Sequence, residues 1–271
     1  MKIYVNEKKV TVPREIKVAD LVKQVKPGAD VCILNGFPCL MEHTIEENDR
    51  LVLIQKGKKP SRQELEHLLM ARHTPGVHAR LKKACVGIVG CGGLGSNAAM
   101  ALARAGIGKL ILADFDVVEP SNLNRQQYFV RQIGQSKVSA LRENIRQANP
   151  YVKIDAHSVR ITPDNVKKLF RSADVIIEAF DLAGQKQMLA EAVLKHLPGK
   201  PLVMGNGMAG YGANDLLKTR RSGDLYICGD GSSEAGHGFG LMAPRVGIAA
   251  HMEANMALEI LLGPDPRISK S

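Results

Sequence analysis

The order of apolar and polar positions divides the chain into a short first segment and a longer second one. Residues 1–57 hold short apolar runs separated by polar turns, and residues 18–25 have the apolar spacing of a helix, which Pro27 and Gly28 end. The expected strands are residues 2–5, 10–12, 31–34 and 50–54. Two strands, a helix and two further strands in so short a segment predict a small β-grasp fold.

Beyond residue 83 the pattern alternates between apolar runs and helical patterns. The mostly apolar runs predict buried parallel strands at residues 84–89, 109–113 and 174–178. Helical patterns are found at residues 96–105, 137–148 and 248–262, and a basic, proline-containing linker with two short helices precedes the first run. We therefore predict an α/β fold, a Rossmann-like sheet with flanking helices plus the small β-grasp domain. The expected boundaries are residues 1–57, 58–83 and 84–271.

A glycine-rich turn follows the first of these apolar runs and precedes a helical pattern. Gly90, Gly92 and Gly95 fit G-x-G-x-x-G, and Gly93 lies within the same turn. Glycines let the backbone approach a phosphate closely, and the free N–H groups of a helix start attract negative charge. Asp114 ends the next run, 24 residues after Gly90, where a Rossmann unit places its ribose-binding acid. This predicts a nucleotide site, with a tight structural turn as the alternative.

Two cations downstream bear on the kind of nucleotide. Arg125 and Lys137 would place positive charge beside the phosphates, which suits a triphosphate better than a hydride-transfer cofactor. Taken singly, each could equally be a solvated surface charge. An NAD(P)- or FAD-binding oxidoreductase and a non-catalytic scaffold that binds a carrier protein therefore stay open as alternatives.

Composition narrows the class of protein further. Of 271 residues, 45% are hydrophobic and 24% charged, as in an ordinary globular protein, and neither a membrane span nor a signal peptide is evident. We expect a cytoplasmic protein. The net charge of +10 favours an anionic partner, but no nucleic-acid motif accompanies it. Five cysteines without a C-x-x-C pair predict free thiols and no four-cysteine zinc site.

Several motifs together resemble one enzyme family. Beside the glycine turn they are Asp114-Phe115-Asp116, Asn122-Leu123-Asn124-Arg125-Gln126, Gly134 with Lys137, Asp181 at a strand end, and Met242-Ala243-Pro244. In order and spacing this set resembles the ThiF/MoeB/HesA adenylyltransferases, which include ubiquitin-activating enzymes, over residues 61–263. Residues 1–57, with VADLV, VCILNG and IEENDRLVLIQ, resemble the ThiS/MoaD ubiquitin-like sulfur carriers.

The resemblance implies a reaction and a set of residue roles. A carrier's C-terminal glycine carboxylate would attack the α-phosphate of ATP and give an acyl-adenylate and pyrophosphate, in thiamine thiazole synthesis or related sulfur transfer. ATP would contact Gly90, Gly92, Gly93, Gly95, Asp114 (ribose), Asp116, Asn122, Arg125, Lys137 and Asp181. Asp181 would hold Mg²⁺, Lys137 would stabilise the departing pyrophosphate, and Arg72 would reach the site from the second subunit of a homodimer. The implied partner is a ThiS-like carrier.

The chain also departs from the family pattern. Residues 1–57 do not end in the diglycine of the carriers, so this segment cannot itself be activated; docking, regulation and plain stability remain open for it. Only Cys228 lies where relatives hold zinc or a reactive cysteine. We expect it in a flexible polar loop, with a pKa raised by Asp230, and favour a passive thiol over a catalytic one. Residues 202–212 are expected to form a flexible wall of the site.

Overall fold

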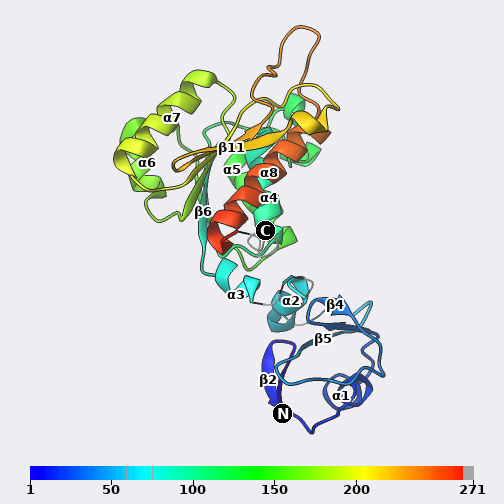
Figure 1. The fold of residues 1–271 in the computed structure, drawn as a ribbon. Coiled ribbons are helices and arrows are strands. Elements are labelled where there is room, and N and C mark those ends of the chain that lie inside the picture. The colour runs from blue at the N-terminus through cyan, green and yellow to red at the C-terminus, as the bar shows by residue number, and fades with distance from the viewer. Residues whose placement is uncertain (59, 61, 72, 75, 265–271) are drawn as a thin grey trace. The chain divides into compact units, whose positions relative to one another are not determined.

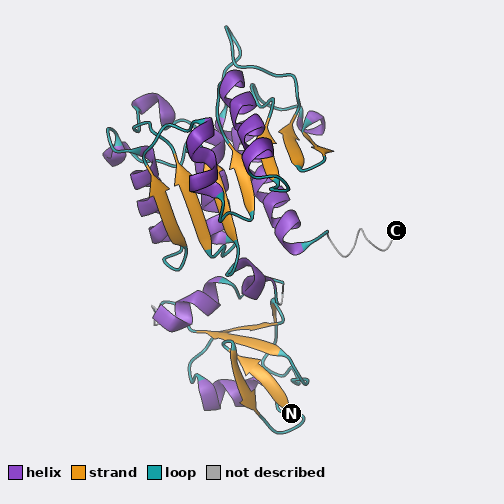
Figure 2. Ribbon diagram, turned by 90° about the vertical axis from the view of Figure 1, so that its left-hand side faces the viewer, coloured by secondary structure: helices purple, strands orange, loops and turns teal. Residues whose placement is uncertain are grey.

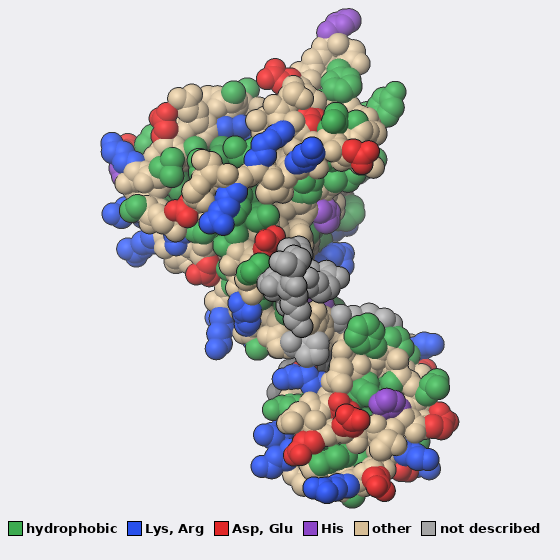
Figure 3. Space-filling view, viewed as in Figure 1, with side chains coloured by type: hydrophobic (Ala, Val, Ile, Leu, Met, Phe, Trp, Pro, Cys, Tyr) green, Lys and Arg blue, Asp and Glu red, His purple; other side chains and the backbone are tan. Residues whose placement is uncertain are grey.

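A computed structural model describes residues 1–58, 60, 62–71, 73–74 and 76–264. The chain forms two compact units, Met1–Ala79 and Arg80–Ser271, each of which has its own sheet (Figures 1 and 2). No helix in the described part of the chain is both long and apolar enough to cross a membrane. On the face drawn in Figure 3, basic side chains are dispersed among acidic and neutral ones in both units.

The first unit is the expected small mixed sheet with one helix packed on it. Its strand order is β2-β1-β5-β3-β4, in which β1 and β5 are parallel and the other pairs antiparallel. The elements are β1 (Lys2–Val5), β2 (Lys8–Thr11), α1 (Val18–Val25), β3 (Val31–Leu34), β4 (Phe37–Pro38) and β5 (Arg50–Ile54). Side chains of α1 and of one sheet face form a buried core. The predicted helix and the strands at residues 2–5, 31–34 and 50–54 are confirmed, whereas the strand expected at residues 10–12 covers residues 8–11, and the short β4 was not predicted.

The second face of this sheet is also covered. Successive residues of a strand point to opposite faces, so Leu51 and Leu53 of β5 lie in the core with α1 while Val52 points away from it. Val52 packs with Ile33 and with Leu68 and Ala71, which belong to α2 (Arg62–Leu69) and the turn after it. Burial on both faces explains why β3 and β5 are continuous apolar runs rather than alternating ones.

The second unit is a doubly wound sheet. Its strand order is β11-β12-β10-β9-β6-β7-β8, and all neighbours are parallel except β11 against β12. The strands are β6 (Cys85–Val89), β7 (Lys109–Ala113), β8 (Lys153–His157), β9 (Val175–Glu178), β10 (Leu202–Gly205), β11 (Lys218–Ser222) and β12 (Leu225–Gly229). Numbered along the chain, the parallel strands follow the Rossmann order 3-2-1-4-5-6, which confirms the predicted fold class.

Helices cover both faces of this sheet (Figures 1 and 2). One group, α4, α5 and α8, packs on one face, and α6 packs with α7 on the other. These helices are α4 (Gly93–Arg104), α5 (Lys137–Ala148), α6 (Pro163–Phe170), α7 (Ala183–His196) and α8 (Ala243–Leu262), and the short α3 (Val77–Leu81) spans the boundary of the two units in the sequence. The last helix begins five residues before the predicted start at Ile248, because Pro244 stands in its first turn.

The winding of the sheet reverses between β6 and β9, which is where sheets of this kind have a crevice. The connection from β6 runs through α4 to β7 on one side, and the connection from β9 runs through α7 to β10 on the other. In such sheets, ligands bind outside the carboxyl ends of the strands at the point where the winding reverses. The glycine turn follows β6 and Asp181 follows β9, so both flank this crevice.

The coverage of the first sheet by α2 predicts the effect of a charge at Val52. Val52→Asp would bury a carboxylate without a partner, and we expect a loss of about 3 kcal/mol or more in the stability of the first unit. Thermal unfolding measures the loss of stability, and limited proteolysis shows whether residues 1–79 are the part of the protein that is destabilised. Thr11→Asp, on the exposed strand β2, is the control. If both substitutions were tolerated alike, the face under Val52 would be open to solvent, contrary to the structure.

Candidate functional site

The glycines after β6 allow two backbone segments to touch. Gly90 has φ +93°, and a Cβ on it would lie 2.7 Å from the carbonyl oxygen of Ala179, just beyond β9. A Cβ on Gly95 would collide with the carbonyl oxygen of Gly90. The space around Gly92 is more open, since a Cβ on this residue would lie 3.8 Å from the nearest atom, in the side chain of Gln126. Close packing therefore requires Gly90 and Gly95, whereas Gly92 leaves the start of α4 accessible.

The start of α4 has the properties of an anion site. No side chain caps it, and its first N–H groups have no earlier helical carbonyl to bond. Gly93 and its neighbour Gly92 are half-buried. The positive end of the helix dipole therefore points into the crevice, which is the arrangement that favours a phosphate.

Asp114 links the end of β7 to the glycine turn. Its carboxylate accepts the N–H of Cys91 at 2.6 Å and that of Asp116 at 2.8 Å. The residue is half-buried, and each carboxylate oxygen keeps a second lone pair. The predicted ribose-binding acid thus lies directly beside the glycine turn.

Lys137 is buried rather than solvated. It is the first residue of α5, and its side chain is 9% exposed. Its ammonium donates to the carboxylate of Asp116 at 2.8 Å, and its backbone N–H donates to the Asp116 carbonyl at 3.0 Å. Asp116 is 46% exposed at its side chain. A buried cation is therefore held at the turn after β7, next to Asp114.

Arg125 lies against the start of α4. Its side-chain carbons are 3.7 Å from where a Cβ on Gly93 would be. The guanidinium donates to the Asn124 side chain at 2.8 Å and to the Ser121 carbonyl at 3.2 Å. The structure thus brings Arg125 to the glycine turn. Asn122, in contrast, is buried, and its side chain accepts the N–H of Glu119 at 3.0 Å within its own turn.

Three residues that sequence reasoning missed hold the Arg125 segment in place. Asn97 donates to the carbonyls of Gly93 (2.6 Å) and Arg125 (3.0 Å). Ser96 accepts the N–H of Gln127 at 3.1 Å, and the Tyr128 hydroxyl donates to the Cys91 carbonyl at 2.7 Å. The available signal was the pair Ser96-Asn97 at the buried start of an otherwise apolar helix, where polar side chains need partners.

Asp181 lies on the opposite side of the crevice. It is exposed and follows Ala179, whose carbonyl packs against Gly90 and whose N–H donates to the Val89 carbonyl at 2.8 Å. No group of three or more metal-ligating side chains occurs among the described residues. A single exposed carboxylate fits a magnesium ion that takes its remaining ligands from phosphates and water. The predicted Arg72 lies outside the described residues.

The expected placement of Cys228 is wrong. The residue lies in strand β12 and is fully buried, with its sulfur 3.6 Å from the Thr219 hydroxyl. Burial raises the pKa of the Cys228 thiol to about 11, with Glu253 adding to the effect and Thr219 opposing it. Asp230 is not among the causes. The glycines that follow this strand suggested a loop, but the pairing of Cys228 with Gly205 and Thr219 extends the strand through it.

A buried ion pair ties the loops beside β12 to α8. Arg245 donates to Asp230 at 2.7 Å, and its side chain is 4% exposed. The same guanidinium donates to the carbonyls of Gly212 and Ala213. Burial by itself would raise the pKa of Asp230, but hydrogen bonds from Ser233, Ser232 and Arg245 hold that pKa below its ordinary value. The expected flexible wall at residues 202–212 is therefore hydrogen-bonded to the start of α8.

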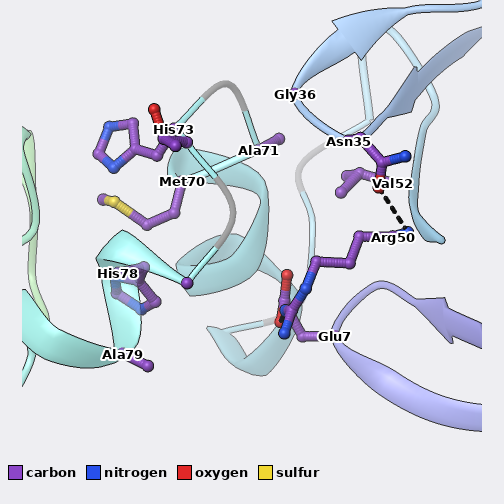
Figure 4. A pocket seen from close by; sticks show the side chains of 12 residues that line it. Glu7, Asn35, Gly36, Arg50, Val52, Met70, Ala71, His73, His78 and Ala79 are labelled. Atoms are coloured by element: carbon purple, nitrogen blue, oxygen red, sulfur yellow. Dashed lines mark hydrogen bonds and ion pairs between the residues drawn. The ribbon is translucent and has the colours of Figure 1, made fainter. Parts of the chain in front are cut away.

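The first unit has a hollow of its own (Figure 4). Glu7 and Arg50 form an ion pair at 2.6 Å there, and the Asn35 side chain accepts the N–H of Arg50 at 3.0 Å. Met70 and Val52 add apolar surface, and burial lowers the pKa of His73. Because Glu7 neutralises Arg50, this hollow offers little to hold a phosphate, and the crevice of the second unit is the better candidate.

The buried thiol predicts slow alkylation of Cys228. At pH 8 a thiol with a pKa of about 11 is almost wholly protonated, and it is shielded from the reagent. We expect iodoacetamide to modify Cys228 at least about 100-fold more slowly in the native protein than in denaturant, as measured by peptide mass spectrometry. Cys39, which is half-buried, serves as the internal control. Equal labelling of the two would contradict a structural role.

The ion pair predicts a large effect of Asp230→Asn. The change leaves the Arg245 guanidinium buried without a counter-charge, and we expect a loss of about 3–5 kcal/mol in unfolding free energy. Denaturant unfolding at pH 7 measures it. The carboxylate stabilises the fold above its unfolded pKa of about 4, so the difference from the native protein should shrink as the pH falls below that value. Asp230→Asn with Arg245→Met should recover most of the loss. Were the double variant no better than the single, the pairing would not be the cause.

Comparison with known proteins identifies the families that the two parts of the chain match. Residues 66–271 match the ThiF family, and residues 1–57 match the ThiS-like ubiquitin family. The probable adenylyltransferase/sulfurtransferase MoeZ of Mycobacterium tuberculosis is 35% identical over 159 residues, 57% of this chain and 40% of that protein. The adenylyltransferase and sulfurtransferase UBA4 of Eremothecium gossypii is 34% identical over 191 residues, 68% of this chain and 43% of that one. The chain thus spans less than half the length of these two relatives.

A solved structure agrees on the fold. The E. coli tRNA N6-threonylcarbamoyladenosine dehydratase TcdA, crystallised in complex with ATP, has a TM-score of 0.67 at 22% identity, covering 79% of this chain and 98% of its own. At this identity the likeness concerns the fold alone. From the two family matches, the chain belongs to the ThiF family and has a ThiS-like ubiquitin domain at residues 1–57.

Proposed function

We propose that the protein is an ATP-dependent adenylyltransferase that activates the C-terminal glycine of a ubiquitin-like sulfur carrier. The proposal rests on one observation. Asp114, Lys137 and Arg125 lie around the start of α4, which no side chain caps. The relatives that match this chain are named adenylyltransferases and sulfurtransferases. TcdA, which shares the fold, was crystallised with ATP and with AMP.

The site suits ATP for electrostatic reasons. The phosphates would lie at the amides of Gly92 and Gly93, and Asp114 would accept the ribose hydroxyls. Arg125 would contact the triphosphate from the segment that Asn97 holds against α4. Lys137 would remain bonded to Asp116 and also reach a phosphate oxygen, because an ammonium has three protons to donate. Two cations beside the phosphates suit the higher charge of a triphosphate better than the pyrophosphate of a hydride-transfer cofactor.

The chemistry follows from charge placement. A carboxylate oxygen of the carrier's last glycine attacks the α-phosphorus, a new P–O bond forms, and the bond to the pyrophosphate oxygen breaks with its electron pair. The nucleophile is already ionised, so no base is needed. Lys137 and Arg125 offset the charge that develops on the leaving group. Asp181 would hold the magnesium ion of ATP, which supplies further charge neutralisation.

We extend the proposal to the partner and the assembly. Residues 1–57 continue into the chain beyond Gly57 without a diglycine end, so the carrier that is activated is a separate ThiS-like protein. The pathway we favour is thiamine thiazole synthesis. Arg72 of a second subunit would complete the site in a homodimer, and the net charge of +10 would help to attract an acidic carrier.

Carrier-dependent exchange of pyrophosphate into ATP tests the proposal. With a carrier that ends in diglycine, the native protein should catalyse exchange, and Lys137→Ala should lower the rate at least about 100-fold, since it removes a fixed charge at the leaving group. Lys168→Ala, at an exposed position of α6, is the matched control and should leave the rate unchanged.

Three outcomes would decide against the proposal. Full exchange in Lys137→Ala would mean that the site is assigned to the wrong residues. Calorimetric binding of NAD in place of ATP would favour the oxidoreductase, and ATP binding without exchange for any carrier would favour a scaffold.

A further inference from the structure

A buried cluster of charged groups lies at the carboxyl ends of β9 and β10. Glu178, the last residue of β9, is fully buried, and Lys186 on α7 donates to both of its carboxylate oxygens at 3.0 Å. Lys186 also donates to the carbonyl of Gly205, the last residue of β10, at 2.9 Å. An ammonium has three protons, and these three contacts use all of them. Lys186 therefore ties the ends of the two strands together.

Glu253 lies in the same cluster but takes no part in the hydrogen bonds of Lys186 with Glu178 and Gly205. It projects from α8, is fully buried, and neither of its carboxylate oxygens has a hydrogen-bond partner in the described part of the chain. Burial, with Glu178 nearby, raises the pKa of Glu253 well above its ordinary value. Lys186 makes no hydrogen bond to Glu253, because its three protons are used by Glu178 and Gly205. Burial raises the pKa of Glu178 as well, and the ion pair with Lys186 opposes that rise.

The ion pair is hydrogen-bonded to the turn that carries Asp181. Besides Lys186, one carboxylate oxygen of Glu178 accepts the N–H of Phe180 at 2.6 Å. Phe180 directly precedes Asp181, and Ala179 before it packs its carbonyl against Gly90. The carboxylate of Glu178 therefore holds the turn from its interior, while Lys186 holds the carboxylate.

We propose that Glu178 and Lys186 are positioning residues that fix the turn 179–181, and through it the metal-binding carboxylate of Asp181. The inference rests on the proposed function, because it takes Asp181 as the ligand of the magnesium–ATP complex. Lys186 cancels the charge of Glu178, so that Asp181 is the negative charge at this strand end that remains available to a cation. The amides belong to the glycine turn and α4, Asp114 and Arg125 to the segments after β7 and η1 (Pro120–Asn122), and Lys137 to α5, so all lie outside this contact set.

Metal-dependent nucleotide binding by the full-length protein tests the inference without any turnover. Mn²⁺ binding in the presence of ATP is measured by electron paramagnetic resonance, and ATP binding in EDTA by calorimetry. We expect Lys186→Met to weaken Mn²⁺ binding about tenfold, while ATP affinity in EDTA changes less than about twofold. Lys186→Arg should restore most of the metal affinity, since a guanidinium can donate to Glu178 and Gly205 together.

Glu253→Gln is the matched control, a neutral, isosteric change in the same buried cluster, and should leave Mn²⁺ binding unchanged. Because Lys186→Met leaves Glu178 without a counter-charge, Glu178→Gln with Lys186→Met provides a second variant that carries no buried charge at this pair. Thermal unfolding checks that each variant is folded. We expect the double variant to fold and to show the same loss of metal affinity.

The outcomes separate the two proposals. Native Mn²⁺ affinity in a folded Lys186→Met or double variant would overturn the positioning role, as would an equal loss of ATP affinity in EDTA or an equal loss in Glu253→Gln. A native protein that binds Mn²⁺–ATP as expected but shows no carrier-dependent exchange would contradict the proposed reaction and leave the positioning role supported.

Discussion

The contact between Gly90 and Ala179 is the constraint on which the second unit depends. It brings the end of β6 against the end of β9, the two strands between which the winding of the sheet reverses. Any side chain at Gly90 would separate them. Because the two ends touch, the start of α4 and the turn that carries Asp181 are held at neighbouring strand ends.

Three buried cations at the carboxyl edge of the sheet each have a carboxylate partner. Lys137 pairs with Asp116, Lys186 with Glu178 and Arg245 with Asp230. Breaking such a pair is costly because it leaves a single charge in a medium of low polarity. The three pairs join a loop or helix to a strand end, so they also determine the shape of the carboxyl edge of the sheet. Arg125 differs, since its guanidinium donates to two neutral oxygen atoms, the Ser121 carbonyl and the Asn124 side chain.

The ThiS-like domain shows how a carrier-like sheet is adapted within a longer chain. In this unit α1 covers one face and the segment of α2 covers the other. An apolar sheet face needs a covering layer, and here the chain that continues past Gly57 supplies it. This arrangement favours a stable, self-contained module.

The sequence alone determined both folds, the glycine turn and the positions of most strands, because strands buried on both faces and a strand–glycine–helix order are local patterns. The spacing from Gly90 also predicted Asp114 beside the glycine turn, and the family resemblance implied Lys137 and Asp181 as residues of the same site. Tertiary structure alone decided that Lys137 is buried against Asp116, that Cys228 lies within a strand, and that Glu178, Lys186 and Glu253 meet. Those facts depend on side chains brought together from distant strands and helices, and the free energy of a buried charge depends on such neighbours, which no local pattern contains.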